Sequence, residues 1–400
     1  MGRLAWLAAA LAGAFALFYA NERTPDPLPA GAPPGAFSAG RALADIVRIA
    51  PVPHPVGSDA NHRVRDDLVA RMTAMGLSPR VQHAQAFEQR GVFAAGATVE
   101  NVIGVVPGRD RNAPALALMA HYDSVPGSPG AADDAAGVAV ALETARMIKA
   151  RGAPARDVML VITDGEEAGL LGARAFYDQD PAAAHVGYVI NMEARGGGGR
   201  AQMFQTGAGN GADIGVLTRN AKALSANSLV VFIYKHMPND TDFTVSDGKG
   251  KPGLNFAFIG RQFDYHSPSS TVAALDVGSV QHMGDEVAPT AIALAFADRL
   301  PPRAPDLVYS STPIGVTVAY PPAVGWLVIA AAVALGALGA WRARRAKALS
   351  WRDLWQGVGA GVLLLVGGAL ALRVARLATG AGFGWLEQRS LLARFPVFEV

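Results

Sequence analysis

The sequence predicts an α/β fold, in which a doubly wound mixed sheet is flanked by helices, together with transmembrane helices near the ends of the chain. Apolar runs bounded by glycine and proline alternate with helix-like segments over most of the 400 residues. This alternation is typical of buried strands connected by helices. Separate uncharged apolar runs of about spanning length lie outside the alternating region. Acidic residues and histidines follow several of the predicted strands, where open α/β sheets bind their ligands.

Helices and an edge hairpin are predicted first. Residues 38–49 have helical periodicity with Ser38 as a plausible cap, and Ser58 or Asp59 precedes a second helix that ends at Gly76. Residues 80–87 and 97–106 read as strands. We expect them to form a hairpin at one edge, which would make the sheet mixed.

The central elements follow in alternation, as expected of strand–helix units in one sheet. Periodicity and the bounding glycines, prolines and caps predict strands at 115–121, 157–163, 186–192, 203–206, 229–234 and 254–259, a flexible turn at 196–199, and helices at 135–150, 168–178, 212–224 and 280–299, with a further helix start near Asp240 and Asp242.

Composition excludes some classes of protein and site. The formal net charge of +2 gives no reason to expect a nucleic-acid partner. There is no cysteine, so disulfides and thiolate zinc sites are excluded. The lack of cysteine does not indicate a cellular compartment, because a secreted domain need not have disulfides.

Three apolar runs predict membrane segments. Residues 4–20 form either an anchor or a signal segment, and we favour an uncleaved anchor. Residues 323–341 and 358–372 are two further spans, for which two buried core helices are the alternative. The segment between them carries Arg342, Arg344, Arg345, Lys347 and Arg352. A short basic loop is typical of the cytoplasmic side, so the region between the anchors is expected outside the cytoplasm, on a periplasmic or lumenal side.

The chain therefore divides into five predicted parts. They are a membrane anchor or signal segment at 1–21, a linker at 22–37, the α/β domain at 38–300, a linker at 301–322, and C-terminal transmembrane helices with the basic loop at 323–400.

The predicted strand ends bring acidic groups and histidines to one crevice. His121 ends one strand, Glu166 and Glu167 follow the next, and Glu193 ends the third. Carboxylates crowded in this way repel one another unless a cation neutralises them. Two divalent ions would neutralise this charge better than one. Without thiolates, zinc prefers histidine nitrogen and carboxylate oxygen.

Individual roles follow from position. Asp133 lies in a glycine-flanked loop after the His121 strand and is the best candidate for a carboxylate that bridges two ions. Asp123 could hold the His121 ring by a hydrogen bond. Glu166 and Glu167 are adjacent, so their side chains diverge, and we assign Glu167 as a ligand and Glu166 as the general base.

These motifs resemble metallopeptidase family 28, the co-catalytic zinc aminopeptidases. The resemblance covers about residues 38–299 and is carried by HYDS at His121, PGAADDAAG at Asp133, DGEEAGLLGA at Glu166, NMEARGGGG at Glu193 and YHS at His266, with PHPVGS upstream. The Glu-Ala-Arg-Gly segment and the membrane helices look most like the membrane-anchored endoplasmic-reticulum and vacuolar branch and its bacterial relatives.

The resemblance implies a role for each matching residue. His121 and Glu193 would hold one zinc ion, Glu167 and His266 the other, and Asp133 both. Many relatives have Asp where Glu193 stands, a departure that the membrane-anchored branch tolerates. Three residues match segments that face the substrate in relatives: Asp240, Asp242 and Tyr265.

The expected function is therefore that of a membrane-anchored exopeptidase with two zinc ions, most simply an aminopeptidase, acting on peptides beside a lipid bilayer. A glutaminyl cyclase-like enzyme with one zinc ion is one alternative on this fold. A non-catalytic, receptor-like module that has lost its ligands is the other.

Overall fold

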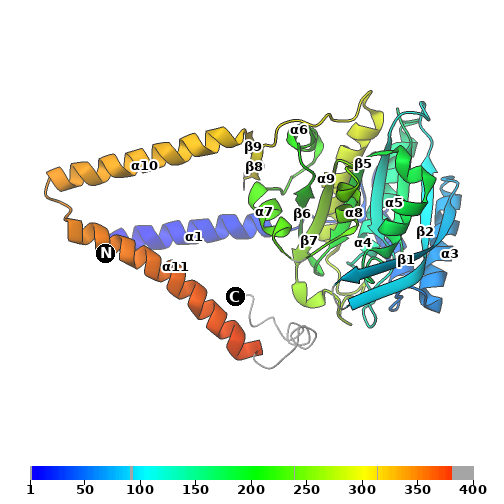
Figure 1. The fold of residues 1–400 in the computed structure, drawn as a ribbon, viewed down its shortest axis with the longest axis horizontal. Helices are drawn as coiled ribbons and strands as arrows, with labels where there is room; N and C mark the ends of the chain where they lie inside the picture. The colour runs from blue at the N-terminus through cyan, green and yellow to red at the C-terminus, as the bar shows by residue number, and fades with distance from the viewer. Residues whose placement is uncertain (1, 91–92, 238, 313, 381–400) are drawn as a thin grey trace. The chain divides into compact units, whose positions relative to one another are not determined.

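The computed structural model describes residues 2–90, 93–237, 239–312 and 314–380 (Figure 1). The chain divides into two compact units, Met1–Ala319 and Tyr320–Val400. The helices are α1 (Gly2–Glu22), α2 (Ala39–Ile49), α3 (Asp59–Ala74), α4 (Ala135–Ala150), α5 (Leu171–Gln179), α6 (Gly211–Asn220), α7 (Ser228–Lys235), α8 (Asp242–Gly248), α9 (Val277–Phe296), α10 (Pro322–Arg345) and α11 (Trp351–Gly380), with short 3₁₀ turns η1 (Pro181–His185) and η2 (Gln262–Asp264).

Within the described residues, one seven-stranded sheet has the order β1-β2-β4-β3-β5-β7-β6. Its strands are β1 (Arg80–Arg90), β2 (Phe93–Val106), β3 (Ala115–His121), β4 (Val158–Thr163), β5 (Val186–Ala194), β6 (Gly198–Thr206) and β7 (Gly253–Gly260), and β8 (Val308–Ser311) pairs separately with β9 (Thr317–Tyr320). The four central strands are parallel, while the β1–β2 hairpin and β6 add antiparallel edges. The predicted mixed α/β sheet with an edge hairpin is confirmed.

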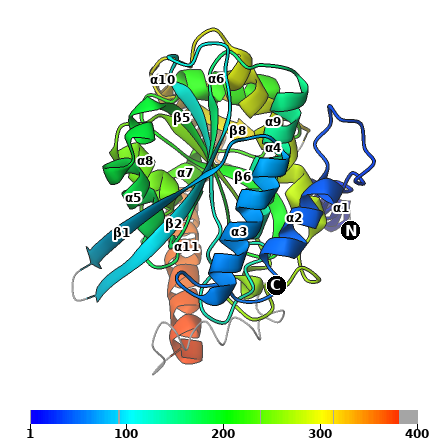
Figure 2. The same ribbon diagram turned by 90° about the vertical axis from the view of Figure 1, so that its right-hand side faces the viewer.

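Strand β3 shows why the sheet is covered on both faces. Its seven residues are all buried. Because side chains alternate along a strand, Leu116 and Leu118 join the core cluster that contains α2, α4 and α9, whereas Ala117 and Met119 join a second cluster with α5 and α8. Figure 2 shows the sheet between these helices. The resulting three layers hold the carboxyl ends of the parallel strands in fixed positions.

One predicted strand is wrong. Residues 229–234 form helix α7, although their β-branched and aromatic side chains favour a strand. The Asn227 side chain accepts a hydrogen bond from the Val230 N–H at 2.8 Å and caps the helix. In addition, β6 begins at Gly198, inside the stretch that was expected to be a turn.

Two helices in the described part of the chain are long and apolar enough to cross a membrane. They are Pro322–Arg345 and Trp351–Ala375, with mean hydropathies of 2.2 and 2.0. In α1 the apolar stretch found is shorter, Ala8–Leu17. Residues 381–400 of the predicted C-terminal part lie outside the described residues, and the five predicted boundaries stay predictions.

The cap of α2 provides a stability test. The buried Ser38 hydroxyl accepts from the Arg41 N–H and donates to the Pro29 carbonyl at 2.8 Å. Ser38→Ala should lower the free energy of unfolding by about 1–2 kcal/mol, because it removes a cap and leaves buried groups without partners. Ser58→Ala, at the part-buried cap of α3, is the matched control and should cost about 0.5–1 kcal/mol. Urea unfolding in detergent measures both values, and equal losses would contradict the larger contribution expected from the buried Ser38 cap.

Candidate metal centre

Strands β3 and β4 bring the first acidic groups together. His121 and Thr163 are paired at the ends of these parallel strands. The chain then turns at Gly165, whose φ of +70° suits glycine. This turn presents Glu166 and Glu167 beside the His121 ring, with Glu166 Oε2 at 4.0 Å from His121 Nε2. The register of two neighbouring strands therefore sets the position of the acidic pair.

Asp133 contacts both histidines. One carboxylate oxygen lies 3.2 Å from His121 Nε2 and the other 2.9 Å from His266 Nε2. Each histidine also faces one glutamate, since His266 Nε2 lies 2.8 Å from Glu167 Oε1 and His121 Nε2 lies 3.7 Å from Glu193 Oε2. The five predicted ligand residues are thus linked through the Asp133 carboxylate.

The His121 ring has a defined orientation. Its Nδ1 lies 3.0 Å from the Asp123 main-chain carbonyl, which can only accept a hydrogen bond. With Nδ1 held in this way, Nε2 faces Asp133 and can donate a hydrogen bond to that carboxylate. Once Nε2 loses its proton, its lone pair is available to a metal ion. The nearer Asp123 carboxylate oxygen is 3.4 Å from Nδ1.

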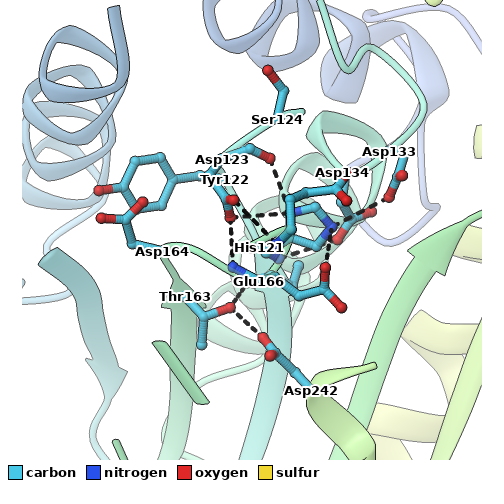
Figure 3. Close-up of polar contacts among 12 residues, drawn as sticks. His121, Tyr122, Asp123, Ser124, Asp133, Asp134, Thr163, Asp164, Glu166 and Asp242 are labelled. Atoms are coloured by element: carbon cyan, nitrogen blue, oxygen red, sulfur yellow. Dashed lines mark hydrogen bonds and ion pairs between the residues drawn. The ribbon is translucent and has the colours of Figure 1, made fainter. Parts of the chain in front are cut away.

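The Asp123 carboxylate also accepts hydrogen bonds from two backbone amides. These are the N–H groups of Glu166 and Glu167, at 3.0 and 3.2 Å. Figure 3 shows this residue between His121 and the Glu166 loop. Asp123 therefore orients both the histidine and the acidic pair that we predicted.

Two further residues support the centre without having been assigned a role from the sequence. Asp134 accepts hydrogen bonds from the His121 N–H and from Gly137, the latter as the cap of α4. Asn191 donates to Glu193 Oε1 at 3.0 Å. The aspartate before the helical run at residue 135 is a recognisable cap signal, and Asn191 lies two residues before Glu193, on the same face of β5.

Burial and crowding of negative charge shift the pKa values of the acidic groups in the site. Burial, and next the charge of Asp133, raise the pKa of Glu167 to about 7, and burial raises that of Glu193 to about 8. Burial also raises the pKa of Glu166 well above its usual range, with neighbouring glutamates adding to the effect. Asp133 is the exception, because hydrogen bonds from His121 and His266 outweigh burial and lower its pKa.

These groups fit a cation site. Within the described residues, His121 and Asp133 with Glu167, and His121 and Asp134 with Glu193, each offer ligand atoms within 4.8 Å of one another. Buried imidazole and carboxylate groups are ligands that zinc prefers when thiolates are absent. A cation would favour the charged carboxylates that burial disfavours.

The three residues predicted to face a substrate occupy different environments. Asp240 is exposed, whereas Asp242 has no exposed surface and accepts a hydrogen bond from Thr163. The Tyr265 ring is stacked on His266, with centroids 3.6 Å apart. Asp242 thus lies beneath the site, and a substrate role for the three residues stays a prediction.

A family model described as peptidase family M28 matches residues 101–291. This range contains the ends of β3, β4 and β5 and the loop that carries His266.

Over residues 101–291 the chain resembles peptidase family M28. One similar protein is the vacuolar membrane protease of Candida dubliniensis, 32% identical over 60% of this chain and 26% of that protein. Another is the endoplasmic reticulum metallopeptidase 1 of Mus musculus, 32% identical over 58% of this chain and 26% of that protein. The chain spans about a quarter of the length of these curated relatives.

Solved structures have a similar fold. An aminopeptidase from Aneurinibacillus sp. strain AM-1 is similar with a TM-score of 0.54 and 13% identity, over 68% of this chain and 97% of that one. A zinc aminopeptidase from Bacillus subtilis gives 0.51 and 15%, over 64% and 95%. Porphyromonas gingivalis glutaminyl cyclase gives 0.51 and 19%, over 64% and 98%.

The raised pKa values predict how the stability of the α/β domain depends on pH without a cation. Burial alone would lower the pKa of His266, but hydrogen bonds to Asp133 and Glu167 raise it to about 9. His266, Glu167 and Glu193 all bind a proton more tightly in the folded state than in the unfolded chain. They therefore stabilise the fold most at low pH, and this contribution is lost between about pH 4.5 and 9.

The thermal unfolding midpoint in chelator should therefore be lower at pH 8.5 than at pH 6. Added zinc should raise the midpoint more at pH 8.5, because deprotonated ligands bind cations better. Glu193→Gln, which removes one of the titrating groups, should reduce the fall measured in chelator. Equal midpoints at both pH values without zinc would contradict the shifts.

Proposed function

We propose that this chain is the catalytic and anchoring part of a membrane-bound, zinc-dependent exopeptidase, and that it acts as an aminopeptidase. The observation that carries the proposal is the position of Asp133, whose two carboxylate oxygens face different histidines. This arrangement is what two neighbouring cations need from a shared ligand.

The proposed ligands form two sets. His121 and Glu193 would hold one zinc ion, Glu167 and His266 would hold the other, and Asp133 would be common to both. The contacts within each set, 3.7 Å and 2.8 Å, support this division. When bound, the zinc ions would supply Lewis acidity at the scissile carbonyl and activate a water molecule for attack.

Glu166 is the proposed general base. It is buried, and its Oε2 lies 4.0 Å from His121 Nε2, beside the proposed ligands. Its raised pKa favours proton uptake. Its carboxylate would take the proton of the attacking water and later give it to the leaving amine nitrogen.

The similar proteins support this chemistry. The names of the relatives describe a membrane protease and a metallopeptidase, and two of the similar folds are aminopeptidases, one named as a zinc enzyme. The glutaminyl cyclase fold supports the alternative reaction, cyclisation of N-terminal glutamine with one zinc ion. The number of zinc ions bound per chain separates the two enzymes. A purified chain that does not bind zinc at high occupancy would favour a receptor-like module.

Glu166→Gln provides the test of the base. The variant should keep its bound zinc, since the proposed ligands are unchanged, and should lose a factor of about 10²–10⁴ in kcat. The assay is release of the N-terminal residue from unblocked peptides, with N-acetylated peptides as the exopeptidase control. Glu167→Gln is the matched variant and should lose zinc as well as activity.

The result can contradict the proposal in several ways. Full activity of Glu166→Gln would remove the base assignment. Hydrolysis of N-acetylated peptides at the same rate would remove the aminopeptidase assignment. One zinc ion per chain, together with cyclisation of N-terminal glutamine, would favour the cyclase.

The membrane arrangement is proposed from the two apolar helices and the basic residues between them. The loop that follows α10 would be cytoplasmic and the α/β domain would lie on the opposite side. Because the chain contains no cysteine, one introduced thiol reports its own side of the membrane.

The topology test compares two exposed positions. Ala348→Cys lies in the basic loop, and Asn112→Cys lies between β2 and β3 of the α/β domain. In sealed cells, a membrane-impermeant maleimide should label position 112 and leave position 348 unlabelled until the membrane is opened. Labelling of position 348 alone would reverse the topology, and immediate labelling of both would indicate that α10 and α11 do not span.

A further inference from the structure

Helix α7 is apolar on both of its sides. Val231 faces the core with 8% of its surface exposed, and the Tyr234 ring packs on Phe204 at 4.6 Å. Phe232 and Ile233, at 61% and 48% exposure, lie on the outer face. Leu229 shares that face by helical spacing and is 65% exposed. A helix on the surface of a soluble domain normally turns polar residues outward. The outer face of α7 therefore indicates contact with a second apolar environment.

The β8–β9 hairpin extends this apolar surface. The Tyr309 N–H of β8 donates to Ser228 Oγ at 2.9 Å, at the first residue of α7. Figure 1 shows α7, β8 and β9 at the same end of the domain. The outward-facing residues of the two elements are Leu229, Phe232, Ile233, Ile314, Val316 and Val318, which we call the α7–hairpin patch.

The chain continues from the patch into a candidate membrane span. Val318 precedes Pro322, the first residue of α10, by four residues (322 − 318). Four residues reach at most about 14 Å. The patch therefore lies close to the point at which the chain would enter the bilayer.

The N-terminal helix is tethered to the same edge of the sheet. Thr24, which follows α1, donates to Asp276 Oδ2 at 3.0 Å, and the Asp276 N–H donates to the Gly197 carbonyl at 2.9 Å, beside the start of β6. Farther along β6, Met203 forms a bridge with Ala226, just before α7. Both anchors thus join the domain along its β6 edge, where the patch lies.

We propose that the α7–hairpin patch docks on the lipid bilayer, with its apolar side chains in the interfacial region of the membrane. An exposed apolar surface of this kind marks an interaction site, and an apolar helix face can lie at the boundary between headgroups and acyl chains. The proposal rests on the membrane anchoring proposed above. The position of the chain's entry into the span favours lipid over another occupant.

A fluorescent label tests the docking in the full chain. Because no cysteine is present, single cysteines at Phe232, Phe87 and Leu335 can carry an environment-sensitive fluorophore, with the protein reconstituted in lipid nanodiscs. Phe87 is the matched control, since it is also an exposed phenylalanine, at 65%, but lies on β1 at the opposite edge of the sheet. Leu335, in the middle of α10, reports whether that helix is in the membrane.

Lipids that carry a spin-label quencher should quench the labels at 335 and 232 several-fold more than the label at 87. Quenching at 335 with none at 232 would overturn the docking and leave the anchoring intact. No quenching at 335 would overturn the anchoring, and the docking with it. A blue-shifted but unquenched label at 232 would show that protein covers the patch, and would also overturn the proposal.

A second pair of variants separates docking from an effect of the label. With the fluorophore at position 229, Phe232→Asp should reduce lipid quenching several-fold, because a charge in the interface opposes insertion. Phe87→Asp, with the same label at 229, should leave quenching unchanged. Unchanged quenching with Phe232→Asp would overturn the assignment of this helix face, and the circular dichroism of both variants checks that they are folded.

Discussion

Asp133 lies between His121 and His266, with one carboxylate oxygen toward each ring. Burial opposes its charge, but the hydrogen bonds from the two imidazoles more than offset this and lower its pKa. The nearby Glu167 and Glu193 have raised pKa values instead. The Asp133 carboxylate therefore stays ionised among crowded, buried acidic groups, and the proposed division into two ligand sets depends on it.

The sheet supplies the rigidity that this interaction needs. β3, β4, β5 and β7 run in parallel at the centre, so their carboxyl ends meet at one edge. Asp123 then ties the end of β3 to the loop after β4, because it holds His121 and accepts both glutamate amides. The network connects neighbouring strands through the backbone and does not rely on side chains alone.

Much of this architecture could be predicted from local patterns. Apolar runs that end in charged residues locate strands and the edge at which a site forms, and the mixed sheet with its hairpin followed from them. The predicted ligand residues lie within reach of one another, while their roles stay predictions. Helix α7 could not be predicted, because a run of β-branched and aromatic residues favours a strand until tertiary contacts and the Asn227 cap decide otherwise.

The contacts of side chains beneath the site also could not be predicted from local sequence patterns. The sequence places Asp242 near a helix start but gives no sign that the fold buries its side chain completely against Thr163. The contact joins residues 79 positions apart. Similarly, Asn191, which contacts Glu193 within β5, also donates to Asn255 of β7, 64 positions away. Such support becomes visible only when distant segments are placed together.

The five proposed ligands do not share the same kind of support. His121 and Glu193 are strand residues, Asp133 immediately precedes the cap of α4, and Glu167 is held by Asp123. His266 instead lies in the connection between η2 and α9, with a φ of +53° that is unusual for histidine. The position of His266 therefore depends on a connecting loop, so a change in that loop can move one proposed ligand and leave the strand-borne residues in place.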